Sequence, residues 1–313
     1  MTDVETETKQ TETMETIKEF PFLQQRLKGM TEKKRVALAC PHDGHTEYVI
    51  ERALDEGFAR FVLTLSRPVS DRLARCIERH GQEVETMTCN SDEEAAERAV
   101  EAVRTNRAQV LMKGTLNTDV LLRAVLDKKR GLLKEGDVMN HIALCHIPDY
   151  GKPLMFSDAA VVPRPSLEQM DAIVGHCVNA CRRLGIDSPY VALTHCTEKV
   201  NPKFEHTMHY QQIKRWAEEG RYGRAVVDGP MDVKTALDAE SGAIKGICSP
   251  VAGKADVLIF PNIEAGNTFY KTVTLFAHAT TAGWLEGTVA PIVVASRADS
   301  EVSKYYSLAM ACL

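Results

Sequence analysis

Near the end of the chain, a hydroxyl, a guanidinium and the start of a helix follow one another directly. The apolar run 290–295 leads into Ser296 and Arg297, and Asp299 and Ser300 then open a helix. The first N–H groups of a helix attract anions, and an Arg can bind phosphate oxygens in pairs. This combination predicts a phosphate site in which Ser296, Arg297 and Asp299 are the catalytic candidates. Ser300 is a candidate substrate contact, although capping the helix is an equally ordinary role for Asp299 or Ser300.

A second polar loop joins a short apolar run to a helix at residues 113–119. A glycine at 114 lets the backbone approach a ligand closely. Because helical side chains lean toward the N-terminus, Arg123 can reach back to an anion held at this loop. The alternative is an exposed Arg above an ordinarily capped helix. The candidate substrate contacts of this segment are Lys113, Gly114, Thr115, Asn117, Thr118 and Arg123.

Two further apolar runs also end in polar residues. Ser157 and Asp158 interrupt such a run, which costs free energy unless both groups are paired, and a polar turn is the alternative reading. The run that ends at Phe260 leads into a polar loop and then into a helix, from which the long side chain of Lys271 can lean back. The candidate substrate contacts of these segments are Ser157, Asp158, Asn262, Glu264, Asn267 and Lys271.

Standard metal, nucleotide and hydrolase motifs are missing from the sequence. His42 with His45, and His206 with His209, have spacings that a metal could use, but neither pair has the further ligands of a structural zinc site. Solvent-facing or capping histidines are the simpler interpretation. The chain also lacks Gly-x-Gly-x-x-Gly, the Walker A pattern and Gly-x-Ser-x-Gly. We therefore expect no metal and no bound cofactor.

Short β-branched runs alternate with amphipathic stretches along most of the chain. The expected strands are 36–40, 61–65, 110–112, 142–147, 154–156, 190–193, 225–228, 257–260 and 292–295. The expected helices are 47–56, 69–79, 92–104, 118–127, 166–184, 201–217, 231–239 and 268–282. This alternation predicts an α/β protein with mostly parallel sheets flanked by helices, and ligands outside the carboxyl ends of the strands. A turn-forming cluster at 148–153 predicts a boundary between two domains.

The bulk composition excludes several classes of protein. The chain has 313 residues, of which 44% are hydrophobic and 26% charged, and its net charge is −5. This balance offers no basic surface for nucleic acid. No apolar run approaches the ~20 residues of a membrane span, so we expect no membrane partner. Residues 1–16 are polar, lack the apolar core of a signal peptide and predict a disordered tail. Nine cysteines without a CxxC pair predict reduced thiols and a cytoplasmic location.

Taken together, the polar segments resemble the phosphate acetyl/butyryl transferase family. The resemblance extends from about Lys34 to the C-terminus and is most specific around residues 259–267. The tail that follows Ser296 looks more like the butyryl branch than the acetyl branch. The segments that carry it are Lys-Gly-Thr-Leu-Asn-Thr-Asp (113–119) with Arg123, Leu-Met-Phe-Ser-Asp-Ala-Ala (154–160), Ala-Asp-Val-Leu-Ile-Phe-Pro-Asn-Ile-Glu-Ala-Gly-Asn (255–267) with Tyr270-Lys271, and Ser-Arg-Ala-Asp-Ser (296–300).

The resemblance implies a fold and a reaction. The fold is two-domain α/β and isocitrate/isopropylmalate dehydrogenase-like, with the active-site cleft between the domains. Residues 17–150 plus 285–313 form the first domain, and residues 151–284 form an inserted second domain. Family enzymes catalyse acyl-CoA + phosphate ⇌ acyl phosphate + CoA, here on butyryl or a similar short-chain acyl group. Coenzyme A is a substrate, the site needs no metal, and the enzymes commonly form homodimers.

One position departs from the pattern of the acetyl branch. That branch has an Asp seven positions after the Ser, which is thought to help deprotonate the thiol of coenzyme A. Here the position is Ser303 and Lys304 follows, so the general base stays unassigned.

The residue set fits direct attack of the coenzyme A thiolate on an acyl phosphate. Ser296 would stabilise the oxyanion, and Arg297 with Arg123 would hold the phosphoryl oxygens. An acyl-cysteine intermediate is the competing mechanism. Competing functions are a non-catalytic protein that binds acyl-CoA or acyl phosphate, and a metal-dependent dehydrogenase of related fold. The candidates for an acyl pocket, which are equally core candidates, are Met155, Phe156, Phe269 and Leu275.

Overall fold

The computed structural model describes residues 20, 23, 26–27, 29–295 and 299–313. The tail expected at residues 1–16 therefore lies outside the described residues. The two candidates Ser296 and Arg297 lie outside them as well.

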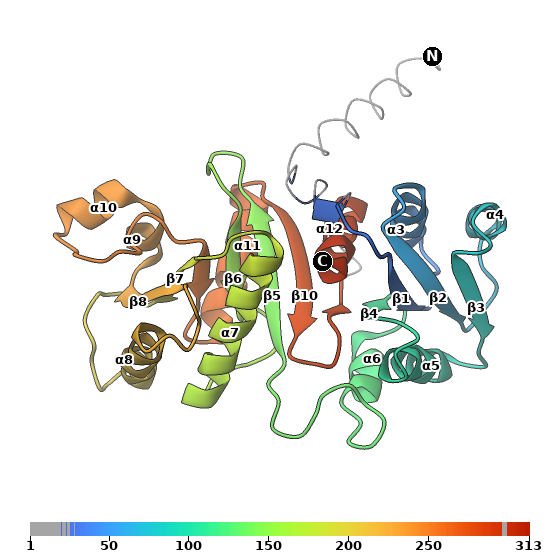
Figure 1. Ribbon diagram of the computed structural model, residues 1–313, viewed down its shortest axis with the longest axis horizontal. Coiled ribbons are helices and arrows are strands. Elements are labelled where there is room, and N and C mark those ends of the chain that lie inside the picture. Colours follow the sequence, from blue (N-terminus) through green and yellow to red (C-terminus); the bar gives the residue numbers. More distant parts are fainter. Residues whose placement is uncertain (1–19, 21–22, 24–25, 28, 296–298) are drawn as a thin grey trace, which may run out of the picture.

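One continuous sheet runs through the molecule (Figure 1). Its strand order is β3-β2-β1-β4-β11-β10-β5-β6-β9-β7-β8, and neighbouring strands in this order are hydrogen-bonded. The sheet is therefore mixed and spans both halves of the chain, whereas the sequence predicted separate, mostly parallel sheets. Helices cover both of its faces.

The first half of the sheet is parallel. Its strands are β1 (Lys34–Ala39), β2 (Ala59–Leu65), β3 (Val84–Thr88) and β4 (Val110–Lys113). The helices between them are α3 (Gly44–Asp55), α4 (Asp71–Arg79), α5 (Asp92–Arg104) and α6 (Thr118–Val125). Alternate residues of β1 pack against helices on opposite faces, Val36 and Leu38 with α3, Ala37 and Ala39 with α5.

The other end of the sheet is a second parallel set. Its strands are β6 (Leu154–Ser157), β7 (Tyr190–Thr194), β8 (Val226–Met231) and β9 (Val257–Ile259). The accompanying helices are α7 (Leu167–Arg183), α8 (Glu205–Glu218), α9 (Val233–Leu237), α10 (Ala239–Ile244) and α11 (Ile263–Phe276). Buried side chains of α7 and α8 join the core on the face of the sheet that α3 covers. Apolar side chains of α9 and α11 pack on the opposite face.

Three strands join the two sets, namely β5 (Asn140–His146), β10 (Thr280–Glu286) and β11 (Ile292–Val293). β10 is antiparallel to both β5 and β11, and β5 is antiparallel to β6. The two parallel sets consequently run in opposite directions. The carboxyl ends of the two sets therefore lie at opposite edges of the sheet.

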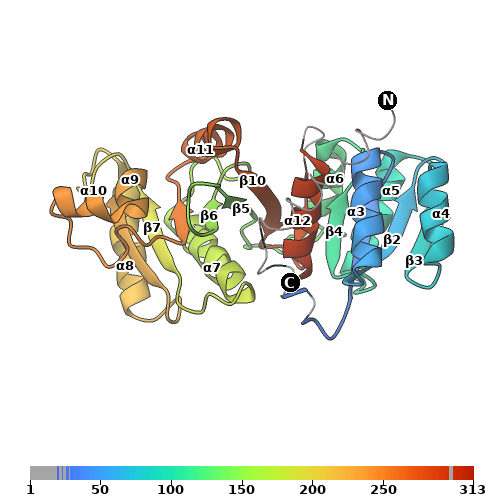
Figure 2. The same ribbon diagram turned by 90° about the horizontal axis from the view of Figure 1, so that it is seen from above.

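The chain ends in α12 (Glu301–Cys312), which packs against β10 and lies beside α3 (Figure 2). Within the described residues, β10 and β11 are paired at Leu285 and Ile292.

Short polar side chains begin most of these helices. Each accepts a hydrogen bond from a backbone N–H of the first turn, which satisfies a group that the helix itself cannot bond. These caps are Asp43, Ser70, Ser91, Ser166, Asp232, Asp238, Asn262 and Ser300.

Two strands of the structure were not predicted from the sequence. β3 reads Val-Glu-Thr-Met-Thr and is mostly exposed at the edge of the sheet, so it lacks an apolar pattern. β10 begins Thr-Thr-Ala-Gly. These small residues do not look like a strand, so the helix expected at 268–282 extends over the first of them. In the structure this helix begins at Ile263 and ends at Phe276. Glu264 and Asn267 therefore lie in its first turns and not in a loop.

Candidate functional site

A cavity of about 210 Å³ lies on the face of β10 that alternate residues Thr281, Gly283 and Leu285 share. α6 forms one wall and α11 the other. α12 contributes Ser303 and Ser307. The polar residues of the lining are Thr118, His141, Asn267, Lys271, Thr281, Asp299, Ser303 and Ser307. We call this space the cleft cavity.

A second hollow of about 300 Å³ adjoins the cleft cavity, because Ala295 lines both. Gly44 and His45 at the start of α3 form one side, and Gly114 and Thr115 after β4 form another. A Cβ atom at residue 114 would lie 2.1 Å from the carbonyl oxygen of Cys40, so only glycine fits there. The N-terminus of α3 gives this hollow a positive partial charge, and we call it the anion hollow.

Lys304 supplies the anion hollow with a buried cation. The residue is 6% exposed and sits in the first turn of α12, where the helix dipole disfavours a positive charge. Its Nζ lies 3.4 Å from Oδ1 of Asp43. Lys304 is thus buried near the N-terminus of its own helix α12 and close to the N-terminus of α3. A positive charge in this place suits the binding of an anion such as phosphate.

Asp43 is the N-cap residue of α3 and connects this helix to Lys304. Its carboxylate accepts hydrogen bonds from the backbone N–H of Thr46 at 3.0 Å and from the Thr46 hydroxyl at 2.6 Å. Burial raises the pKa of Asp43, but these hydrogen bonds and the charge of Lys304 outweigh burial, and the net shift is downward.

Asp43→Asn is expected to destabilise the protein at neutral pH by about 2 kcal/mol. The carboxamide still caps α3, but Lys304 loses its counter-charge, which costs roughly 3–5 kcal/mol in a fully buried pair. The smaller figure applies because the Asp43 side chain is 32% exposed. The native carboxyl titrates below its ordinary value of 3.8, so its stabilisation is present above that pH and is lost as the pH falls through the native pKa. Urea unfolding at stepwise lower pH should show the gap between wild type and variant closing below pH 3.8, and a constant gap would contradict this account.

Asp158 and Ser157 are buried, and their side chains form hydrogen bonds with neighbouring groups of the protein. The Asp158 carboxylate accepts backbone N–H groups from residues 141, 160, 161 and 162, at 2.9, 2.7, 2.9 and 3.3 Å. The Ser157 hydroxyl donates to the His141 carbonyl at 2.8 Å and accepts from the Asn140 side chain at 2.9 Å. These side chains shape the turn after β6, which lies under the cleft cavity.

α11 brings Asn267 and Lys271 to the cavity wall. The Asn267 amide donates to the Ala159 carbonyl at 3.0 Å, and the Lys271 ammonium lies 4.6 Å from the centre of the Tyr270 ring. A Cβ atom at residue 266 would lie 2.1 Å from the Asp158 carbonyl oxygen. Gly266 thus lets α11 approach the Asp158 turn closely enough to carry Lys271 over the cavity.

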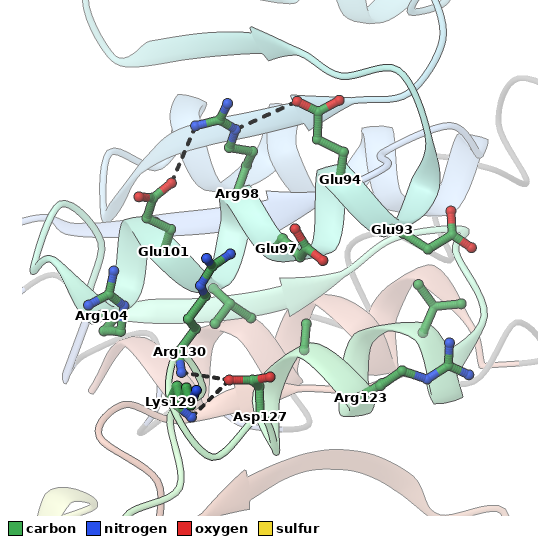
Figure 3. Close-up of a pocket in the computed structure, with 13 residues that line it drawn as sticks. Glu93, Glu94, Glu97, Arg98, Glu101, Arg104, Arg123, Asp127, Lys129 and Arg130 are labelled. Atoms are coloured by element: carbon green, nitrogen blue, oxygen red, sulfur yellow. Dashed lines mark hydrogen bonds and ion pairs between the residues drawn. The ribbon is translucent and has the colours of Figure 1, made fainter.

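Arg123 lies elsewhere. It lines a separate hollow of about 1020 Å³ among charged side chains of α5 and α6 (Figure 3). Its side chain is 75% exposed, and the nearest carboxylate, that of Asp119, is 4.0 Å away. On α6, residues Thr118 and Leu122 are the ones that reach the cleft cavity. The structure therefore does not bring Arg123 together with Lys271.

The other candidates from the sequence serve as caps or supports. The Lys113 ammonium, in a side chain that is nearly buried, donates to the carbonyls of Gly114 and Leu116 and so shapes the loop. Asn117, Asn262 and Ser300 occupy the N-cap positions of α6, α11 and α12. Glu264 is exposed in the first turn of α11. The suggested acyl-pocket residues, Met155, Phe156, Phe269 and Leu275, do not line the cleft cavity.

The sequence did not point to His141, Tyr270 was noted only as part of the family resemblance, and Lys304 only for its place beside Ser303. For Lys304 a usable signal existed, since a lysine in the first turn of a helix opposes the dipole. His141 gave no signal, because it begins an apolar strand and reaches the cavity only through the pairing of β5 with β10.

Within the described residues, no three His, Cys, Asp or Glu side chains gather in a way that could hold a metal ion. None of the helices in the described part of the chain combines the length and the apolar character that a membrane crossing requires.

Residues 62–312 match the family model described as "Phosphate acetyl/butaryl transferase". The chain is 37% identical over 278 residues to a probable phosphate butyryltransferase of Bacillus subtilis, covering 89% of this chain and 92% of the relative. It is 35% identical over 280 residues to the phosphate acetyltransferase of Thermotoga maritima, covering 90% and 95%. A branched-chain phosphotransacylase from Enterococcus faecalis superimposes with a TM-score of 0.77 at 29% identity, covering 89% and 97%.

These comparisons correct the fold prediction. The solved structures that match well are phosphotransacylases and phosphotransacetylases with an α/β fold. The expected label, isocitrate/isopropylmalate dehydrogenase-like, is therefore wrong, although a helix-flanked α/β sheet is consistent with the structure.

Proposed function

The chain belongs to the phosphate acetyl/butyryl transferase family, and we propose that its cleft cavity and anion hollow together form the active site. The enzyme is a phosphate acyltransferase that exchanges phosphate and coenzyme A on a short-chain acyl group. The observation that supports the proposed location is the buried ammonium of Lys304 in the anion hollow, which adjoins the cleft cavity at Ala295.

In this proposal each space takes one part of the reaction. The phosphoryl group binds in the anion hollow, at the N-terminus of α3 and beside Lys304. The acyl carbon lies in the cleft cavity, where the sulfur of coenzyme A attacks it. Lys271 adds positive charge at the α11 wall and favours the thiolate. From the sequence we also propose Ser296 as an oxyanion donor and Arg297 as a phosphoryl ligand.

We propose a preference for butyryl or a similar acyl chain. Leu122, Leu285 and Val294 give the cleft cavity an apolar side that suits a short alkyl group. The similarity to enzymes named phosphate butyryltransferase and branched-chain phosphotransacylase points the same way.

Leu122→Phe is expected to shift the preference toward acetyl. A larger side chain in this wall removes space for the distal carbons, and each methylene contributes about 1–3 kcal/mol, or roughly 10- to 200-fold in kcat/KM. The ratio of kcat/KM for butyryl-CoA to that for acetyl-CoA should fall by at least the lower factor. Leu126→Phe, at the exposed end of the same helix, is the matched control and should keep the wild-type ratio. An unchanged ratio in Leu122→Phe would remove this wall from the acyl site.

Further proposals concern assembly and organisation. We propose that the enzyme is a cytoplasmic homodimer that needs no metal or cofactor, with residues 151–284 inserted into a domain of residues 17–150 plus 285–313. Leu275 and Phe276, which are 67% and 76% exposed at the end of α11, suit an interface. Light scattering with chromatography should give twice the mass of one chain.

A thiol-release assay tests the function itself. The enzyme is mixed with phosphate and acyl-CoAs from acetyl to branched five-carbon chains, and free thiol is followed with a dye. Release that depends on phosphate, fastest with four- or five-carbon chains, is expected. Binding of acyl-CoA without release of thiol would instead indicate a non-catalytic binding protein.

A further inference from the structure

The imidazole of His141 lies at the cleft cavity with an unpaired nitrogen. The backbone of His141 is held independently of its ring, by Asp158 at its N–H and by Ser157 at its carbonyl. Within the described residues, Nδ1 is shielded from solvent and has no hydrogen-bond partner. Buried polar atoms are almost always paired, so an unpaired one in a residue that lines a cavity calls for an explanation, and a catalytic role is one.

The neighbouring strand β10 leaves space for this ring at Gly283. A Cβ atom at residue 283 of β10 would lie 2.8 Å from Nε2 of His141 and 3.4 Å from Cε1. Gly283 does not have a positive φ, so the backbone conformation does not demand glycine there. The space above Gly283 is what the ring needs, and Gly283 itself lines the cleft cavity. The ring edge with Nε2 therefore lies at the cavity wall.

Charged groups approach the ring from three elements. Asp158 lies after β6, Asp299 precedes α12 and Lys271 belongs to α11, whose Tyr270 ring centre is 6.4 Å from that of His141. Burial lowers the pKa of His141 most strongly, the two carboxylates oppose this effect, and Lys271 adds to it. The net shift is downward, so the imidazole is neutral near pH 7 and can accept a proton.

We propose that His141 is the general base that takes the proton of the coenzyme A thiol, a role that rests on the function proposed above. As the S–H bond breaks, the sulfur forms a bond to the acyl carbon and the proton moves to the imidazole. The tetrahedral intermediate then expels phosphate, which takes the proton from the imidazolium and leaves as hydrogen phosphate. His141 returns to its neutral form. In the reverse direction, the imidazolium protonates the departing thiolate. Ser303, across the same cavity, has no group that could serve as this base.

His141→Gln tests the proposal, with His146→Gln as the matched control. Both histidines belong to β5, but His146 lies at its other end and outside the cleft cavity. In the direction from acyl phosphate to acyl-CoA, kcat of His141→Gln should fall by about 10²- to 10⁴-fold. The fall of wild-type kcat at low pH, which reports protonation of the imidazole, should disappear in the variant. The control should keep the wild-type rate, pH profile and melting curve.

Two further variants separate catalysis from structure. Gly283→Ala displaces the ring while keeping the imidazole in the protein, and should also lower kcat. Added imidazole should restore part of the rate to His141→Ala, which a purely structural role would not allow. If His141→Gln does not fold, Gly283→Ala takes its place as the test, and a wild-type kcat of Gly283→Ala would overturn the proposal. A folded His141→Gln with the wild-type kcat and pH profile also overturns it. If the wild-type enzyme itself shows no exchange with any acyl-CoA, the proposed function fails and not the role of His141 alone.

Discussion

Lys304→Met is expected to raise the KM for phosphate by about 10- to 100-fold. A hydrogen bond to a charged group contributes about 1.5–3 kcal/mol, and each 1.4 kcal/mol is a tenfold change in affinity. Methionine keeps much of the volume of lysine, so packing around α12 should survive. Steady-state kinetics with phosphate varied against saturating acyl-CoA measure the effect.

Lys214→Met is the matched control for this experiment. Lys214 also pairs with a carboxylate, that of Asp228 at 2.7 Å, but it lies on α8 and outside both spaces of the proposed site. Its KM for phosphate should equal that of the wild type. If Lys304→Met also keeps the wild-type KM, the anion hollow is not where phosphate binds.

Asp158→Asn is expected to cost about 3 kcal/mol of stability. The carboxylate accepts four backbone N–H groups in a side chain that is 3% exposed. A carboxamide turns an N–H donor toward some of these donors, and leaving buried groups unsatisfied costs about 1–3 kcal/mol each. Because the same turn holds His141 and contacts α11, the rate of acyl exchange should fall as well.

Asp127→Asn is the control for Asp158→Asn. Asp127 also accepts two backbone N–H groups of a turn, from Lys129 and Arg130, but it is exposed to water. Water can replace those bonds, so unfolding in urea should change little. Equal unfolding midpoints for the two variants would show that burial of Asp158 does not matter.

Much of the order of strands and helices could be predicted from the sequence, because each βαβ unit has a recognisable local pattern of apolar and polar residues. Apolar strands such as β1 and β4 are buried on both faces and stand out from the polar turns that follow them. The cap Ser300 marks the start of the last helix. The polar segments after apolar runs drew attention to Thr118, Asn267, Lys271 and Asp299, and these four residues line the cleft cavity.

Properties that depend on pairing between distant strands could not be predicted. Nothing local shows that β5 and β10 run antiparallel at the centre, yet this pairing reverses one half of the sheet and places His141 opposite Leu285. The same limit applies to helix faces. Leu122 lies one turn after Thr118 and shares its face, whereas Arg123 is rotated about 100° further and faces another hollow.

A crystal structure with phosphate and an unreactive butyryl-CoA thioether would show where both substrates bind. Phosphate is expected in the anion hollow, within hydrogen-bond distance of the Lys304 ammonium. The acyl group is expected in the cleft cavity, with its sulfur beside the imidazole of His141. Phosphate or acyl group bound in the hollow between α5 and α6, or anywhere else away from these two spaces, would contradict the proposed location of the active site.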